Sequence, residues 1–150
     1  MILTKLTRED ALVILDMGKT FHGESQFAHE PFNAEKCWGL LDSTVTHPTR
    51  RFIAYDSEFK GFIIMGINEH FFSSAKKAED FCLYIDPEFR GGRLVLRLLE
   101  AAEKWCKENG AIDMTINHNT GINTERAPQL FNKLGFDMKG YIFTKELEHV

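Results

Sequence analysis

The clearest chemical signal in the chain is the run FCLYIDPEFRGGRLV at residues 81–95, in which an apolar stretch passes through a glycine pair into an amphipathic one. This order predicts a strand, a tight turn and a helix. A helix N-terminus carries free backbone N–H groups and a partial positive charge, so it attracts anions. Gly91 and Gly92 would let a ligand approach the backbone because neither has a Cβ, and Arg90 and Arg93 add positive charge. The run is a candidate diphosphate site, although it matches neither GxxxxGK[ST] nor GxGxxG, and a plain turn with solvated arginines is the alternative.

Hydrophobic periodicity and turn residues predict the elements that must position this run. We expect the order β-α-α-β-β-β-α-β-α-β, which gives an α/β (α+β) fold with a mixed, mostly antiparallel sheet and helices on both faces. The expected ranges are a strand at Ile2–Lys5, a helix from Thr7 to about Gly18, a loop at His22–Pro31, a helix capped by Asn33, strands at Arg51–Asp56, Gly61–Asn68 and Phe81–Ile85, a helix at Gly92–Asn109, a strand at Ile112–Asn117, a helix at Thr124–Leu134 and β structure over Asp137–Leu147.

Length and composition bound the class of protein. The chain has 150 residues, 43% of them hydrophobic and 27% charged, as expected for one globular domain over 1–150 that needs no metal. The formal charge of −4 argues against a nucleic-acid partner, because binding phosphates requires a basic surface. Three cysteines without a CxxC pair indicate reduced thiols in a cytoplasmic protein. The absence of a long apolar stretch or signal peptide predicts no membrane partner.

Two motifs together resemble one known family. Residues 81–95 are similar to the acetyl-CoA-binding motif of the GNAT superfamily of N-acetyltransferases, where a strand and turn lead into R/Q-x-x-G-x-G/A at a helix start. The later run APQLFNKLGF at residues 127–136 resembles the family's closing helix, usually A-x-x-L-Y-x-x-x-G-F. The order of elements agrees from residue 1 to about 147. The resemblance therefore implies a GNAT-like fold and acetyl-CoA-dependent transfer of an acetyl group to a primary amine.

The resemblance also assigns roles to residues. Backbone amides of 90–95 would hold the diphosphate, and the backbone of 83–85 would pair with the pantetheine arm. The sequence departs from the family at Arg93 and Val95, which occupy the glycine-like positions, and at Phe131, which replaces a tyrosine that often protonates the departing thiolate. Tyr84 or Tyr141 could supply that proton instead, as could solvent. The expected cofactor contacts are Leu83, Tyr84, Ile85, Arg90, Gly91, Gly92, Arg93, Leu94, Val95, Asn123, Thr124 and Phe131.

Direct transfer also requires a group that removes a proton from the incoming ammonium, which a carboxylate or histidine can do. The residues considered for this role are Glu24, Glu69, His70, Asp80 and His118. The loop that begins at His22 falls where the family builds its acceptor site. The expected acceptor contacts are Phe21, Glu24, Phe27 and His118. For each residue, a solvated or structural role is the alternative.

Four functions fit these patterns. They are an N-acetyltransferase for a small amine, a protein acetyltransferase for lysine or N-terminal amines, a non-catalytic acyl-CoA-binding module, and a structural protein without a ligand. The final predicted strand would leave an exposed edge, which suggests a homodimer. The identity of the acceptor lies beyond the sequence.

Overall fold

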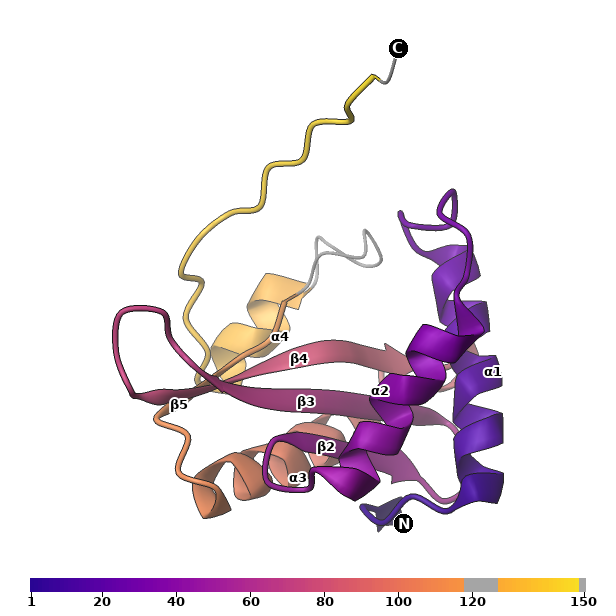
Figure 1. The fold of residues 1–150 in the computed structure, drawn as a ribbon, viewed down its shortest axis with the longest axis horizontal. Coiled ribbons are helices and arrows are strands. Elements are labelled where there is room, and N and C mark those ends of the chain that lie inside the picture. The colour runs from indigo at the N-terminus through magenta and orange to yellow at the C-terminus, as the bar shows by residue number, and fades with distance from the viewer. Residues whose placement is uncertain (118–126, 149–150) are drawn as a thin grey trace.

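The computed structural model describes residues 1–117 and 127–148, which form an α/β arrangement around a five-stranded sheet (Figure 1). The strand order is β1-β2-β3-β4-β5, antiparallel from β1 to β4 and parallel between β4 and β5. The predicted fold class is confirmed. The elements are β1 (Ile2–Leu3), α1 (Arg8–Glu24), α2 (Ala34–Thr46), β2 (Arg51–Asp56), β3 (Gly61–Glu69), β4 (Lys76–Ile85), a 3-10 turn at Pro87–Phe89, α3 (Leu94–Glu108), β5 (Asp113–Thr115) and α4 (Ala127–Lys133).

Helices cover both faces of the sheet because successive residues of β2 and β3 point to opposite sides. Helices α1 and α2 cover one face, and α3 covers the other. The first face, called here the α1/α2 face, buries Ile14, Leu41, Ile53, Tyr55, Phe62, Ile64 and Tyr84. The second, the α3 face, buries residues including Phe52, Ala54, Ile63, Met65, Leu98, Ala102 and Trp105. The amphipathic stripe predicted for the third helix is thus confirmed as a core contact.

Helix α1 extends six residues beyond the end that the pattern predicts, from Gly18 to Glu24. Its start is set by the Thr7 hydroxyl, which accepts a hydrogen bond from the Asp10 amide at 3.1 Å. The predicted end at Gly18 is wrong, because the helix continues to Glu24. Contacts outside the helix offset the low helix propensity of glycine: the Phe21 ring lies 4.9 Å from the Tyr84 ring. The start of the predicted loop is therefore helical.

A β-bulge in β4 changes which face its residues point to. The strand begins at Lys76 and not at Phe81 as predicted. Asp80 lies opposite Met65 of β3, whereas Cys82 lies opposite the preceding residue, Ile64, so Phe81 is the extra residue. Asp80 is therefore opposite a residue of the α3 face, and Cys82 is opposite a residue of the α1/α2 face.

Strands β4 and β5 separate soon after they meet. They pair only from Lys77 to Glu79, because β5 is limited to Asp113–Thr115 and is shorter than the predicted Ile112–Asn117. Within the described residues, the side of β4 away from β3 has no strand partner from residue 80 to residue 85. This part of the strand offers free backbone N–H and C=O groups along the opening between the two strands.

The predicted β structure over Asp137–Leu147 is wrong for the described part of the chain. The segment runs away from the body (Figure 1), and its Met138 and Phe143 are exposed. No neighbouring strand accepts its backbone hydrogen bonds here, and a single strand is not stable by itself. Helix α4 ends at Lys133, close to the expected boundary, before Gly135 at a φ of +88°.

Two glycines give opposite predictions for stability. A Cβ on Gly61 would lie 2.7 Å from the backbone oxygen of Tyr84, whereas a Cβ on Gly39 of α2 would meet nothing within 4 Å. We expect Gly61→Ala to lower the free energy of unfolding by about 1–3 kcal/mol through overpacking. Gly39→Ala should raise it by about 0.5–1 kcal/mol through helix propensity. Urea unfolding of both variants measures the difference, and equal midpoints would show that β3 and β4 are not in close contact at Gly61.

Candidate functional site

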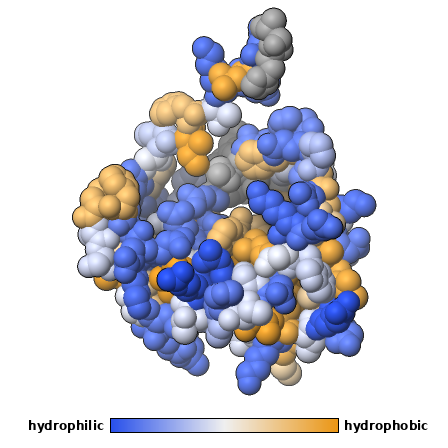
Figure 2. Space-filling model, in the orientation of Figure 1, coloured by the Kyte–Doolittle hydropathy of each residue, from blue (hydrophilic) through white to orange (hydrophobic). Residues whose placement is uncertain are grey.

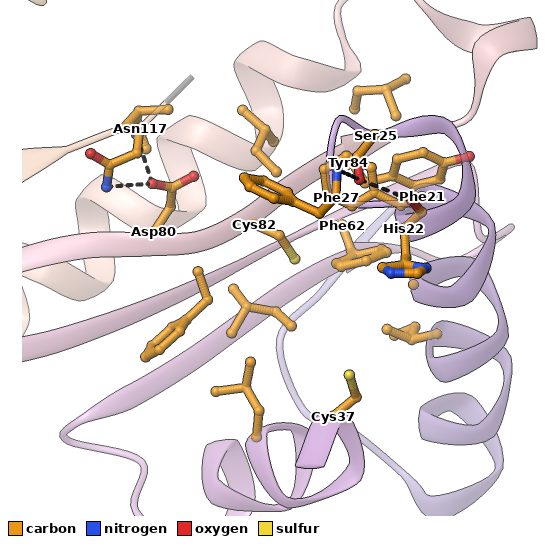
Figure 3. A pocket seen from close by; sticks show the side chains of 18 of the residues that line it. Phe21, His22, Ser25, Phe27, Cys37, Phe62, Asp80, Cys82, Tyr84 and Asn117 are labelled. Atoms are coloured by element: carbon orange, nitrogen blue, oxygen red, sulfur yellow. Dashed lines mark hydrogen bonds between the residues drawn. The ribbon is translucent and has the colours of Figure 1, made fainter. Parts of the chain in front are cut away.

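One cavity of about 990 Å³ opens between α1, α2, the free part of β4 and α4. The space-filling view shows apolar surface near the centre of this side of the molecule, with polar residues around it (Figure 2). In the close-up, side chains from α1, α2, β3 and β4 converge on the cavity (Figure 3). The opening between β4 and β5 is continuous with it, since both Asp80 and Asn117 line the cavity wall.

Asp80 is the carboxylate best placed for proton transfer. Its Oδ1 accepts a hydrogen bond from the Asn117 backbone amide at 2.8 Å and is 3.4 Å from the Asn117 side-chain nitrogen (Figure 3). Burial raises the pKa of Asp80 to about 6, although the hydrogen bonds from Asn117 lower it. A carboxyl group that titrates close to neutral pH, beside a cavity, has the properties of a general base.

Tyr84 presents a hydroxyl group without a partner. The side chain is 2% exposed, and among the described residues its Oη atom has no hydrogen-bond partner. The ring packs between Phe21 and Phe62, with centroid distances of 4.9 and 5.9 Å. Burial and the carboxylate of Glu24 raise the pKa of Tyr84, so the group stays a neutral donor at physiological pH.

Arg90 ties the predicted diphosphate turn to the end of α1. Its Nε donates to the Ile85 carbonyl at 2.8 Å, and its guanidinium forms an ion pair with Glu24. The two charges offset one another, so the Glu24 carboxylate, which was expected to attract a cationic acceptor, is engaged by an arginine. The Arg90 guanidinium also lies 5.7 Å from the centre of the Tyr84 ring.

The turn before α3 retains the features of an anion site. Gly91 has a φ of +91°, and a Cβ there would meet nothing within 4 Å, so the backbone is open to approach. Arg93 is the N-cap residue of α3 and makes no side-chain cap hydrogen bond. Beside the turn lies a second hollow of about 420 Å³, whose lining includes Lys60, Arg93 and Arg97 and the carboxylates of Asp56 and Glu88. Lysine and arginine side chains outnumber the carboxylates in this lining, next to the free amides of the helix start.

The remaining predicted site residues fall in three places. The cavity is lined by Phe21, Phe27, Leu83, Ile85, Gly92, Val95 and Phe131, in addition to Asp80, Tyr84, Arg90 and Gly91. Glu24 does not line it, and Arg93 and Leu94 line the second hollow instead. Glu69 and His70 lie outside it, at the end of β3 and just beyond, where the centre of the His70 ring lies 3.9 Å from that of the tilted Phe72 ring. Tyr141 is 79% exposed on the C-terminal segment. His118, Asn123 and Thr124 lie outside the described residues.

Several cavity residues carried no signal in the sequence. Asn117 was only the end of a predicted strand, although that end faces Asp80 across the opening. His22 was the start of a predicted loop, but it lies in α1 and its buried Nε2 has no partner among the described residues. On α2, the side chains of Cys37 and Leu40 line the cavity as well. Whether these residues line the cavity depends on how the helices and strands pack against one another, and hydrophobic periodicity carries no information on that packing.

Solved structures share this fold at low sequence identity. An aminoglycoside acetyltransferase from an uncultured soil metagenomic sample is 16% identical, with a TM-score of 0.70 and 99% of both chains covered. Glucosamine-6-phosphate N-acetyltransferase from Arabidopsis thaliana is 13% identical, with a TM-score of 0.71 and 99% of both chains covered. A ribosomal-protein-alanine N-acetyltransferase from Brucella melitensis is 13% identical, with a TM-score of 0.69, and the match covers 98% of this chain and 99% of that one. These three names specify different acceptors on one fold, so the fold does not identify the acceptor.

No curated protein matches the chain in sequence. Across residues 1–117 and 127–148, none of the helices has the length and apolarity to cross a membrane. The family model for the acetyltransferase (GNAT) family matches residues 14–136, which include the turn before α3, Asp80 and α4. The chain therefore belongs to the acetyltransferase (GNAT) family, and it is an N-acetyltransferase.

Proposed function

We propose that residues 1–150 form a single domain that transfers an acetyl group from acetyl-CoA to a primary amine, with Asp80 as the general base. The observation that carries the proposal is the position of Asp80. Its carboxyl, with a pKa of about 6, lies at the point where β4 loses its pairing with β5 and its backbone becomes free. The proposed base therefore lies where the cavity proposed for the acceptor meets the free edge of β4.

The described residues fit acetyl-CoA. The free backbone of 83–85 offers donors and acceptors to the amide groups of the pantetheine arm, in the manner of an added strand. The turn at Gly91 and Gly92, the first amides of α3, and Arg93 and Arg97 form a positive site for phosphate groups. When bound, acetyl-CoA would supply an activated thioester carbonyl. Leu83 and Phe131 line the part of the cavity next to this edge.

Asp80 would prepare the amine. A primary ammonium has an ordinary pKa near 10.4, so it must lose a proton before its nitrogen lone pair can attack a carbonyl carbon. Above pH 6 the Asp80 carboxylate is ionised and can accept that proton, while the Asn117 amide holds its Oδ1 in place. The sulfur leaves as a thiolate of ordinary pKa near 8.5, and the unpartnered hydroxyl of Tyr84 is a proton donor on the same strand.

Asp80→Asn tests the base. The variant keeps an oxygen that can accept from the Asn117 amide but cannot take a proton. We expect kcat to fall about 10²–10⁴-fold, with binding of acetyl-CoA unchanged by calorimetry. In the wild type, kcat/KM should fall as the pH drops through about 6, and this limb should vanish in the variant.

Glu79→Gln is the matched control, since Glu79 is the neighbouring carboxylate on β4, is exposed and does not line the cavity. It should keep the wild-type rate and the acid limb of the pH profile, with that limb moved slightly to lower pH, because the charge of Glu79 is the smallest of the influences on the pKa of Asp80. If Asp80→Asn and Glu79→Gln show equal activity, Asp80 is not the base.

The raised pKa of Asp80 also predicts how the free energy of unfolding changes with pH, which can be measured without an activity assay. The folded pKa of Asp80, about 6, lies above the unfolded value of about 3.9, so the folded protein binds the proton more tightly. Its contribution to stability is fully present below about pH 4 and is lost as the pH rises through 6. Asp80→Asn has no such loss. Urea unfolding from pH 4 to pH 7 should show the variant gaining about 2–3 kcal/mol relative to the wild type, and a constant difference would contradict the pKa.

The donor site is tested by titrating acetyl-CoA into the protein. Arg93→Ala removes a positive side chain next to the start of α3 and should weaken binding about 10-fold, with less effect at high salt. Lys104→Ala removes an exposed positive charge from the same helix, away from its start, and should bind like the wild type. Equal affinities for the two variants would place the phosphates elsewhere, and no binding to the wild type would overturn the proposed donor.

A further inference from the structure

The cavity continues from Asp80 along the α1/α2 face, and there its lining is apolar. Ile14, Leu40, Leu41, Phe62 and Ile64 line this part, contributed by α1, α2 and β3. Cys82 of β4 and Cys37 of α2 also line it (Figure 3). Burial raises the pKa of both thiols, so they are neutral at physiological pH. This region, called here the apolar chamber, therefore favours hydrocarbon, and the charged side chain of α2 that lines the same cavity, Lys36, is a cation.

Carboxylates are scarce around the apolar chamber. Among the described residues that line the whole cavity, the carboxylates are Asp80 and Glu30, and Glu30 is exposed in the loop between α1 and α2. Glu24, the other carboxylate near this end of α1, is paired with Arg90. An ammonium group that entered the chamber would lose its water without gaining a counter-ion, which is strongly unfavourable. A polycationic acceptor, such as a polyamine or an aminoglycoside, does not fit these charges.

The order of the side chains along β4 links the chamber to the base. Asp80 precedes the bulge, and Cys82 follows it on the α1/α2 face, opposite Ile64. Asp80 is opposite a residue of the α3 face, but both side chains line the same cavity. One molecule at the free edge of β4 can therefore place an amine beside Asp80 and extend an apolar body past this edge, over Cys82 and toward α2. The buried Nε2 of His22, unpartnered among the described residues, adds one hydrogen-bonding atom to the lining.

We infer that the acceptor is a primary monoamine with an apolar alkyl or aryl body, which occupies the apolar chamber while its nitrogen lies at Asp80. The inference rests on the proposed function. We assign the chamber to the acceptor and not to the acyl chain of the donor. The loop residues Phe27, Glu30 and Pro31 line the same cavity, so the chamber extends from the β4 edge to the α1–α2 loop.

Hexylamine and 1,6-diaminohexane test the inference, because they share length and reacting group and differ in one terminal ammonium. With acetyl-CoA as donor, kcat/KM for hexylamine should exceed that for the diamine by about 100-fold or more. Each methylene from ethylamine to hexylamine should raise kcat/KM about fourfold while the chamber fills. Calorimetric titration of the amines into the protein without donor should give the same order of affinity. A preference for the diamine in these assays would overturn the inference.

Leu40→Glu places a carboxylate in the chamber and should reverse the preference, favouring 1,6-diaminohexane over hexylamine. Val45→Glu introduces the same charge on α2 at a residue that is 55% exposed and outside the cavity, so it should keep the wild-type ratio. Circular dichroism checks that both variants fold. Equal ratios for the two folded variants would show that the amine body does not enter the chamber.

Cys37→Phe fills the chamber without adding charge, so it remains informative if Leu40→Glu does not fold. It should lower kcat/KM for hexylamine at least about tenfold while sparing ethylamine. A second donor, hexanoyl-CoA with ethylamine as acceptor, tests whether the chamber holds the acyl chain instead. If Cys37→Phe impairs hexanoyl transfer and spares hexylamine acetylation, the chamber holds the acyl chain and the inference is wrong.

Acetylation of polyamines or aminoglycosides in preference to hexylamine would overturn the inference and keep the proposed function. Acetyl-CoA binding without acetylation of any amine would overturn both.

Discussion

The bulge at Phe81 is the constraint on which the site depends. An extra residue in β4 moves the following side chains to the other face, so one strand supplies Asp80 before the bulge and Cys82 and Tyr84 after it. The bulge is kept in place by close packing: a Cβ on Gly66 would lie 2.7 Å from the Phe81 ring, and the Arg51 guanidinium lies 5.1 Å from its centre. In a regular strand the side chains of Asp80, Cys82 and Tyr84 would all point to one face, because alternate residues of a strand share a face.

The free edge and the perturbed carboxyl have a common cause. Where β5 stops pairing with β4, its chain continues to Asn117, whose amide has no strand partner and donates to Asp80 instead. That hydrogen bond alone would lower the pKa of Asp80, but the burial that accompanies it is the larger effect and raises the pKa to about 6. The separation of two strands thus gives a backbone edge for a ligand and a carboxyl that titrates near neutral pH.

The sequence predicted most of the fold because the fold depends on local patterns. Caps at Thr7 and Asn33 and the apolar stripe of α3 are local, and the structure has them. The errors concern long-range contacts. Helix α1 passes Gly18 because its last turns pack on Tyr84, the bulge is fixed by Gly66, and residues 137–147 do not form the expected strand, since strand formation requires a neighbour. The glycines of the turn before α3 predict that turn from the sequence. The sequence does not predict the contact of Asn117 with Asp80 or the apolar chamber, because both depend on how distant strands and helices pack together.

Two carboxylates, Asp80 in the cavity lining and Glu24 at the end of α1, differ in the groups that they contact. Glu24 and Asp80 have the same chemical group, but Glu24 is neutralised by Arg90 and fixes the end of α1, whereas Asp80 has only hydrogen-bond donors and no counter-ion among the described residues. The Glu24 carboxylate is thus already engaged by an arginine, whereas the Asp80 carboxylate, buried without a cation, has a raised pKa and accepts a proton more readily. The same pairing removes a negative charge from the α1 end of the cavity. The arginine predicted to bind a phosphate therefore helps to keep the chamber apolar, which connects the donor turn to the choice of acceptor.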